Sequence, residues 1–298
     1  MFSLLDACGA CVVQGWGIVF KKITDVRELR LMANTVRQDL IRMLAEAKSG
    51  HAGGTIGLAD VFTVLYFNAL NHDPKNPEWP ERDRFILSNG HVAPVRYAVM
   101  AETGYFPKEE LMTLRKLGTR LQGHPHAADL PGMETSSGSL GQGLSIACGI
   151  AWAAKYDKKD FRVYCSIGDG EAQEGQVWEA AMFAAQYKLD NITCFLDRNF
   201  LQIDGNTEQV MALDPLKARW ESFGWHVIGA DGHDVAATVK AFDDAKKTKG
   251  KPVIILFKTK MGKCISYMED CAAWHGKVPN KEEETKALSE LEAQRKEI

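Results

Sequence analysis

The sequence has no excess of basic residues, no low-complexity segment and no repeated unit. Its 36 lysines and arginines are balanced by 39 acidic residues, which gives a formal net charge of −3. A chain without a basic surplus lacks the electrostatic footprint that nucleic acids and anionic membranes require of their partners. We therefore expect neither a nucleic acid nor a membrane as a partner.

The seven cysteines are odd in number and lack the spacing of a disulfide framework. This usage is typical of a reducing compartment, so we expect a cytoplasmic protein. Cys8 and Cys11 form a Cys-x-x-Cys pair, which would suit metal binding or redox chemistry. Because no second pair accompanies it, we assign neither role.

Residues 1–22 lack the features of a targeting segment although they are mostly apolar. Asp6 stands where a signal peptide carries positive charge, and the basic pair Lys21-Lys22 follows the apolar run. A secretory signal has the opposite order, and the glycines and the charge argue against a membrane span. We expect an atypical extension over 1–22, such as an upstream start codon would produce, and one domain over 23–298.

The segment 163–199 predicts two strands joined by a helix. Apolar, strand-like runs flank a segment of helical periodicity in the order 163–167, 175–188 and 192–196. This spacing is that of a βαβ crossover, in which the two strands are parallel. If the strands are neighbours, Asp169 and Asn199 leave the sheet at the same carboxyl edge, where open α/β sheets bind ligands.

These residues have the chemistry of a metal and phosphate site. A carboxylate and a carboxamide supply the hard oxygen ligands that Mg²⁺ or Ca²⁺ prefers, and phosphate oxygens would complete the shell. Gly168 and Gly170 let the backbone turn sharply and approach a phosphate. Taken alone, however, the glycine turn and Asn199 are equally consistent with ordinary caps in any doubly wound domain.

The rest of the chain continues the alternation of helices and strands. We expect further helices from Asp25 to about 48, over 58–69, from about 143 to 154 and from about 234 to 249. We expect further strands over 85–87, 225–230 and 253–257, and a glycine-rich loop over 49–54. The near-continuous apolar run at 253–257 is typical of a strand buried on both faces. The fold class is therefore α/β, with a doubly wound, mainly parallel sheet and helices on both faces.

Several segments together resemble transketolases. The Gly168-Asp169-Gly170 turn, followed after about thirty residues by Asn199, looks like the thiamine diphosphate fingerprint. Glu174 in EAQEG and Glu179 in VWEAA narrow the likeness to transketolases. The other matching segments are SGHAGG at 49–54, LSNGH at 87–91, GHP at 123–125, SGSLGQG at 137–143 and WHG at 274–276. A dinucleotide site is a weaker interpretation of 138–143, because its glycines run GxxGxG and no strand precedes them.

The resemblance implies a cofactor and a metal. Thiamine diphosphate would be bound with Mg²⁺, for which Ca²⁺ or Mn²⁺ could substitute. The implied metal ligands are Asp169, Asn199 and the backbone carbonyl of Leu201. The implied cofactor contacts are His91, Gly138, Leu140, Gly168, Gly170, Glu174, Asn199 and His275.

The resemblance also assigns substrate contacts to His51, His124 and His275, which would face the sugar phosphates. Taken singly, His51 is better explained as a helix C-cap residue, and a histidine beside a tryptophan, such as His275, is normally a packing residue. Two positions depart from the family pattern. Ala52 stands where proline is usual, and Cys264 stands where glycine is usual.

The implied reaction is transfer of a two-carbon ketol unit from a ketose phosphate to an aldose phosphate. The resemblance covers roughly 31–279, whereas full-length transketolases continue into a pyrimidine-binding domain and a third domain. The chain therefore resembles the N-terminal subunit of a split transketolase. Glu174 and Glu179 match interface glutamates, and the glutamate that activates the cofactor would lie on a C-terminal partner subunit. We expect a heterotetramer that is active only when assembled.

Three alternatives remain open. A split transketolase could act on an unusual sugar, such as a sulfo- or branched sugar. Deoxyxylulose phosphate synthase shares the GDG…N site, but it usually lacks the EAQEG and WHG arrangement. A non-catalytic subunit is a third interpretation, against which the intact metal ligands and the four histidines at matching positions argue.

Overall fold

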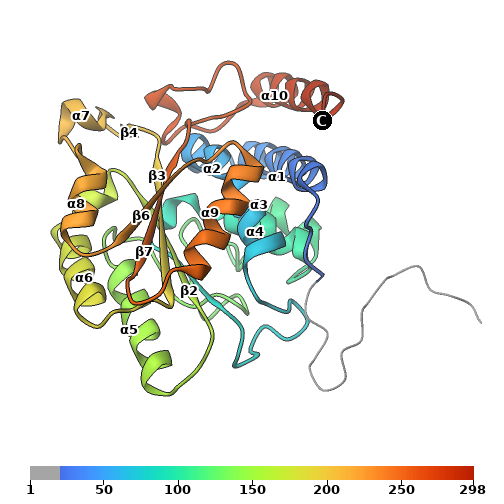
Figure 1. Cartoon of the computed structure of the whole chain (residues 1–298). Helices are drawn as coiled ribbons and strands as arrows, with labels where there is room; N and C mark the ends of the chain where they lie inside the picture. The colour runs from blue at the N-terminus through green and yellow to red at the C-terminus, as the bar shows by residue number, and fades with distance from the viewer. Residues whose placement is uncertain (1–20) are drawn as a thin grey trace, which may run out of the picture.

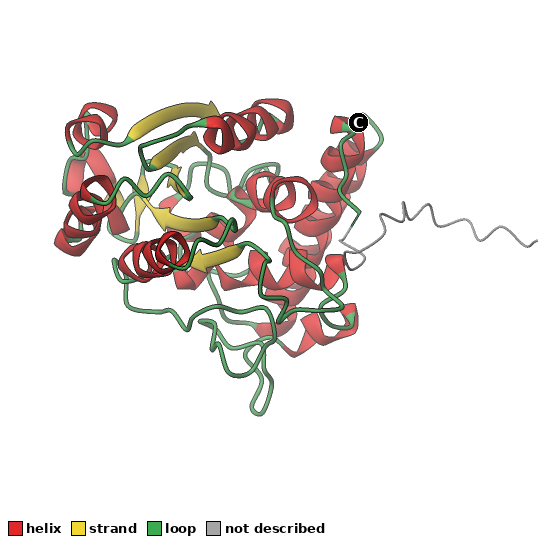
Figure 2. Cartoon of the chain, turned by 60° about the horizontal axis from the view of Figure 1, so that its bottom comes forward, coloured by secondary structure: helices red, strands yellow, loops and turns green. Residues whose placement is uncertain are grey.

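Five parallel strands form the central sheet of residues 21–298, the part of the chain that this computed structural model describes. The expected extension over 1–22 lies almost wholly outside the described residues, as do Cys8 and Cys11. Figures 1 and 2 show the sheet with helices packed on both sides of it. The doubly wound, parallel α/β fold is therefore confirmed.

The strand order places β2 and β3 side by side in the middle of the sheet. Across the sheet, the strands are β1 (Arg84–Leu87), β2 (Val163–Gly168), β3 (Ile192–Arg198), β7 (Val253–Lys258) and β6 (His226–Asp231). Every neighbouring pair is parallel, and Gly168 of β2 pairs in register with Asp197 of β3. Asp169 and Asn199 therefore leave the sheet at one edge from adjacent strands, as the βαβ pattern predicts.

Two helical layers cover the sheet. One layer contains α1 (Val26–Ala47), α2 (Ala52–Gly57), α3 (Ala59–Val64), α4 (Ala93–Thr103), α9 (Val235–Lys247) and α10 (Lys281–Arg295). The other contains α5 (Gly143–Tyr156), α6 (Gly175–Gln186) and α8 (Leu216–Ser222). Each layer shares a separate hydrophobic core with one face of the sheet.

Alternation along the strands explains why both faces are apolar. In β3, Phe195 packs into the core of the first layer, whereas Cys194 and Leu196 pack into the core of the second. Successive side chains of a strand point to opposite faces. A strand covered by helices on both sides is therefore mostly apolar along its whole length. Phe195 is fully buried, and truncating it to alanine would cost about 3 to 5 kcal/mol of stability.

Helices α1 and α10 begin at residues whose side chains cap them. The side chain of Asp25 accepts a 2.8 Å hydrogen bond from the backbone N–H of Glu28 at the start of α1. Asn280 and Glu283 form a capping box at the start of α10. Each cap satisfies backbone donors that the first turn of a helix leaves free, which typically contributes about 1 kcal/mol.

Short elements complete the chain. They are a π-helical turn (Leu65–Ala69), 3-10 turns (Gly90–Val92, Lys108–Thr113, Glu171–Gln173 and Ala272–Trp274), the hairpin β4 (Leu201–Gln202) and β5 (Gly205–Asn206), and α7 (Thr207–Val210). The expected helix over 58–69 is thus α3 with the π-helical turn, and the expected strand at 225–230 lies one residue later.

The expected glycine-rich loop over 49–54 was wrong in its second half. Helix α2 already begins at Ala52, so Gly53 and Gly54 are helical. Glycine is needed here for close approach rather than for a turn. A Cβ on Gly53 would lie 2.4 Å from Cγ of Met261, and the carbonyl of Gly53 accepts a 2.9 Å hydrogen bond from the N–H of Gly262.

Between residues 21 and 298, every helix is too short or too polar to span a bilayer.

Candidate active site

The segments that carry the predicted site residues lie at the carboxyl edge of the sheet. The LSNGH segment follows β1, the Gly168–Gly170 turn ends β2, Asn199 follows β3, and the loop that leads to His275 follows β7. Four neighbouring strands therefore deliver their polar residues to one side of the sheet. This is the position at which open α/β sheets bind ligands.

A buried carboxylate, Glu171, ties three of these segments together. It accepts a hydrogen bond from the hydroxyl of Ser88, a 2.8 Å hydrogen bond from the N–H of Gly141 and a 3.0 Å hydrogen bond from the N–H of Gly168. Burial raises the pKa of its carboxyl group, although these three donors oppose the rise. Glu171 was not predicted from the sequence. The only sign of its role there is that an acidic residue directly follows the glycine turn.

Asp169 is buried with both carboxylate oxygens aimed at the backbone around it. One oxygen accepts a 2.8 Å hydrogen bond from the N–H of Gly170, and the other accepts a 2.7 Å hydrogen bond from the N–H of Phe200. Burial, together with the nearby Asp197 carboxylate, raises the pKa of Asp169 to about 7. The guanidinium of Arg198 lies 3.5 Å from one Asp169 oxygen and opposes this rise. A bound cation would stabilise both buried carboxylates further.

Asp197 fixes the orientation of Asn199. The Nδ2 amide of Asn199 donates a 2.8 Å hydrogen bond to Asp197, and its Oδ1 accepts a 2.9 Å hydrogen bond from the N–H of Leu201. Asp197 also accepts a hydrogen bond from the hydroxyl of Thr259. The carboxamide oxygen of Asn199 thus faces the Leu201 loop, which is the side where a metal ligand is expected. This orienting role of Asp197 was not predicted.

The donor set fits a hard cation that shares its shell with phosphate. Within residues 21–298, no group of three or more His, Cys, Asp or Glu side chains forms a self-sufficient metal site. Asp169, Asn199 and the carbonyl of Leu201 would supply only part of an octahedral shell, and Mg²⁺ typically completes such shells with substrate or cofactor phosphates and water.

Four histidines from four different segments converge into what we call the histidine cluster: His51, His91, His124 and His275. The ring of His51 lies 5.3 Å from that of His91, 6.2 Å from that of His124 and 5.8 Å from that of His275, measured between centroids. The rings of His91 and His275 stack at 5.3 Å. The structure therefore brings together every histidine that the resemblance placed at the site.

The histidine cluster is uncharged at neutral pH. Burial is the largest cause in each case, and it lowers the pKa of His91 to about 3 and that of His51 to about 4, with further lowering by neighbouring histidines. Burial also lowers the pKa values of His124 and His275. A neutral imidazole carries one donor and one acceptor nitrogen, so each ring can both give and take a proton.

Buried polar atoms without partners line this region. In the described part of the chain they include Nδ1 of His51, Nδ1 of His275, Oδ1 of Asn89 and Oγ of Ser137. Leaving a buried polar group unpaired costs about 1 to 3 kcal/mol. A ligand rich in oxygen atoms, such as a diphosphate or a sugar, would satisfy these atoms, so the residues present fit the implied cofactor and substrates.

The remaining candidate residues lie along the open side of the site. Gly138 packs beside the ring of His124, since a Cβ added to it would lie 3.8 Å from that ring. Leu140 is 37% exposed. Glu174 lies against Gly141, and both Glu174 and Glu179 are exposed on the first turns of α6. None of these four is enclosed by the described chain itself.

An apolar surface, which we call the α5/α6 face, lies on these two helices toward their C-terminal ends. Its exposed side chains are Trp152, Tyr156, Met182, Phe183 and Tyr187. They contact one another, with Trp152 stacked on Tyr156 at 5.6 Å and Phe183 lying 4.6 Å from Tyr187. Contiguous apolar surface of this kind is typical of a protein–protein interface.

Trp178, which is also on α6, does not belong to this face. The ring of Trp178 packs inward, 4.9 Å from Trp220 and 5.0 Å from Phe223. Its indole N–H donates a 3.0 Å hydrogen bond to the carbonyl of Ala172. Trp178 therefore belongs to the core beneath α6.

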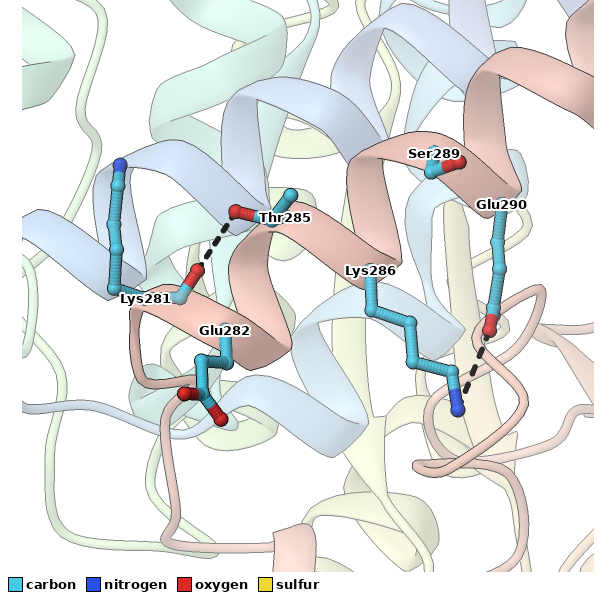
Figure 3. A pocket seen from close by; sticks show the side chains of 6 residues that line it. All are labelled: Lys281, Glu282, Thr285, Lys286, Ser289 and Glu290. Carbon is cyan, nitrogen blue, oxygen red and sulfur yellow. Dashed lines mark hydrogen bonds and ion pairs between the residues drawn. The ribbon is translucent and has the colours of Figure 1, made fainter.

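Figure 3 shows a pocket of about 520 Å³ that is lined by side chains of α10. Its lining side chains mostly contact each other along the helix, as Lys286 does with Glu290 at 3.8 Å. It contains no residue of the histidine cluster and none of the candidate metal ligands. We therefore place the candidate active site at the carboxyl edge of the sheet.

The family model described as "Transketolase, thiamine diphosphate binding domain" matches residues 29–293. The chain belongs to the transketolase family. This match covers both helical layers and every segment of the candidate site. It also shows that the chain is of the domain type that binds thiamine diphosphate.

Two transketolase relatives are matched along nearly their whole length. A 6-deoxy-6-sulfo-D-fructose transketolase subunit of Clostridium sp. is 43% identical, with 89% of this chain and 96% of the relative covered. An apulose-4-phosphate transketolase subunit of Phocaeicola vulgatus is 40% identical, with 89% of this chain and 94% of the relative covered. This chain therefore corresponds to the N-terminal subunit of a split transketolase.

Single-chain transketolases are matched over less than half of their length. The crystal structure of transketolase from Campylobacter jejuni superposes with a TM-score of 0.85 at 35% identity. The match covers 90% of this chain and 43% of that one. The likeness extends over nearly all of this transketolase-family chain and confirms the thiamine diphosphate-binding fold.

Proposed function

We propose that this chain is the cofactor-binding half of a two-chain enzyme that transfers a two-carbon ketol unit from a ketose phosphate to an aldose phosphate. The observation that carries the proposal is the position of the histidine cluster. Four neutral histidines meet at the same sheet edge as the buried Asp169 and the oriented Asn199. Binding groups for a diphosphate and proton-transferring groups for a sugar are thus available side by side.

In this proposal, Asp169, Asn199 and the Leu201 carbonyl hold Mg²⁺, and Gly168, Gly170, His91 and His275 face the diphosphate. Thiamine diphosphate supplies the carbon nucleophile and the electron sink that ketol transfer needs. Gly138, Leu140 and Glu174 lie where the open side of the site would receive the rest of the cofactor. The unpartnered atoms of Asn89 and His275 support this placement.

His51, His124 and His275 would contact the sugars. Because their imidazoles are neutral, each can donate a hydrogen bond to a developing alkoxide and exchange a proton with a substrate hydroxyl. The rings around His51 lie 5.8 to 6.2 Å apart between centroids, which is contact distance for aromatic rings, so one ligand could contact several of them at once. Such placement of several donors around one reacting carbon is what the reaction requires.

A second chain would complete the site. The open side at Leu140 and Glu174 and the α5/α6 face both support docking of a subunit with a pyrimidine-binding domain. That subunit would contribute the carboxylic acid that activates the cofactor, and Glu174 and Glu179 would lie in the interface. We propose a heterotetramer with two copies of each chain.

The sugars themselves are a further part of the proposal. The two relatives matched along nearly their whole length are named for a sulfo-sugar and for apulose phosphate. A split enzyme acting on a sulfonated or branched sugar is therefore a specific second candidate beside transfer between ordinary sugar phosphates. Both share the same cofactor and the same histidine cluster.

The test is an assay of the chain combined with a pyrimidine-domain chain, thiamine diphosphate and Mg²⁺. Ketose donors labelled with ¹³C at the first two carbons would be offered as phosphates and as sulfonates, with aldose acceptors. We expect His124→Gln to lower turnover by about 10²- to 10⁴-fold while cofactor affinity stays unchanged. Near-normal turnover of this variant would remove His124 from the site, and unlabelled acceptors would refute ketol transfer.

A further inference from the structure

Arg115 lies beside the histidine cluster, although it belongs to no motif that the sequence analysis singled out. Its Nη1 donates a 2.6 Å hydrogen bond to Oγ of Ser49, two residues before His51. Its Nε is buried without a hydrogen-bond partner. Across residues 21–298, no carboxylate lies within ion-pair distance of its guanidinium. Arg115 therefore brings a positive charge without a counter-ion to the cluster.

Gly123, which precedes His124, packs directly against the same guanidinium. A Cβ at position 123 would lie 2.6 Å from Nε and 2.7 Å from Cζ of Arg115. These distances are too short for any real contact, so the guanidinium occupies its place only because residue 123 has no side chain. Arg115 thus contacts two of the four segments that carry a histidine of the cluster, just ahead of His51 and just ahead of His124.

The backbone holds Arg115 in this place. Its φ of 61° is in the left-handed region, which is uncommon for arginine. Its N–H donates a 2.9 Å hydrogen bond to the carbonyl of Leu121 and closes the turn that leads to Gly123. The neighbouring cation on this turn, Lys116, instead points to the surface, where it pairs with Glu46 at 2.6 Å.

We propose that Arg115 is a positioning residue whose guanidinium holds the segments carrying His51 and His124 at their mutual distance. The proposal rests on the proposed function for the use that the enzyme makes of the two histidines. The contacts of Arg115 with Ser49 and Gly123 do not depend on the proposed function.

The electrostatic neighbours of the two rings provide a specific readout. His51 faces His91, His124, His275 and Arg115, whereas His124 faces His51 and Arg115. After burial, the Arg115 charge contributes to lowering the pKa values of His51 and His124. Only burial lowers that of His275. Loss of the guanidinium should therefore affect two histidines of the cluster and spare His275.

The test is an NMR titration of the purified full-length chain labelled at histidine Cε1, with each resonance assigned through single His→Gln variants. We expect Arg115→Gln to move the titrations of His51 and His124 to higher pH and to leave His275 in place. Lys116→Gln is the matched control, because it removes a neighbouring charge outside the cluster. Arg115→Lys, which keeps the charge, should restore the titrations.

Gly123→Ala provides a second variant, since its methyl group displaces the guanidinium without removing the charge. It should shift the same two histidines in the same direction. The proposal is overturned if His51 and His124 titrate in both variants as they do in Lys116→Gln. It is also overturned if the titrations of all four histidines shift equally. In the assembled enzyme, Arg115→Lys should lower kcat/KM by up to about a hundredfold despite its preserved titrations. The titration needs no activity, so absent ketol transfer would refute the proposed function alone.

Discussion

The hydroxyl of Ser88 donates a hydrogen bond to the carboxylate of Glu171, although 83 residues separate them in the chain. Ser88 directly follows β1, and Glu171 follows the glycine turn that ends β2. Through Gly141, the same carboxylate also holds the loop that precedes α5. A single buried side chain therefore fixes the relative positions of three segments that carry candidate cofactor contacts.

Replacing Glu171 should destabilise the chain strongly. Glu171→Ala leaves three buried donors without an acceptor, and each such loss costs about 1 kcal/mol or more. We expect the free energy of unfolding, measured by urea denaturation of the purified chain, to fall by at least about 3 kcal/mol. Glu109→Ala, at an exposed position, should change it by less than about 0.5 kcal/mol. Equal effects of the two variants would show that the Glu171 hydrogen bonds are not structural.

Asp169→Ala should weaken Mg²⁺-dependent cofactor binding and leave the fold intact. Loss of a metal ligand removes both a charge and a coordination position, so we expect the affinity for thiamine diphosphate with Mg²⁺ to fall by at least about a hundredfold. Calorimetric titration of the assembled enzyme measures this change. Asp204→Ala, on the exposed tip of the β4–β5 hairpin, serves as the control. Unchanged affinity in Asp169→Ala would mean that the metal site lies elsewhere.

His72 should make the stability of the chain depend on pH. Burial lowers its pKa to about 4, whereas an unfolded chain titrates at about 6.5. Below pH 6.5 the unfolded state therefore binds a proton that the folded state excludes. The contribution of His72 is complete above pH 6.5 and is lost as the pH falls toward 4. Between pH 7.5 and 5.0 the loss is about 2 kcal/mol.

The measurement is the unfolding free energy of the wild-type chain and of His72→Gln at these two pH values. We expect the difference between the two proteins to be smaller at pH 5.0 by about this amount. If the difference is the same at both values, the imidazole of His72 is not held neutral by the fold.

The α5/α6 face should be needed for assembly with the partner chain. Met182 is 56% exposed in this face, so Met182→Glu should leave the isolated chain folded. Burying the new carboxylate in an apolar interface should weaken association at least about tenfold. Light scattering during size-exclusion chromatography of the mixed chains would measure it. Val26→Glu, on the opposite helical layer, is the control, and equal association of both variants would place the interface elsewhere.

The fold could be predicted from the sequence because its signals are local. Apolar runs such as 253–257 and the glycine turn around Asp169 mark strands and their carboxyl ends without any knowledge of packing. The positions of His51, His91, His124 and His275 followed from matched motifs. Their convergence into one cluster depended on the order of the strands, whereas the βαβ pattern predicted only that β2 and β3 are parallel.

What the sequence could not reveal were contacts between segments distant along the chain. Glu171 and Asp197 act through partners such as Ser88 and Thr259, and no spacing rule links these positions. Gly53 was misassigned to a loop for the same reason, since the side chain that requires a glycine there is that of Met261.

The most direct test of the account is a titration of this chain with a pyrimidine-domain chain at fixed concentrations of thiamine diphosphate, Mg²⁺ and a ¹³C-labelled ketose donor. The account predicts no transfer of the labelled two-carbon unit by either chain alone, and a rise in transfer that reaches its plateau at equal amounts of the two chains. Full activity of this chain by itself would contradict the shared site.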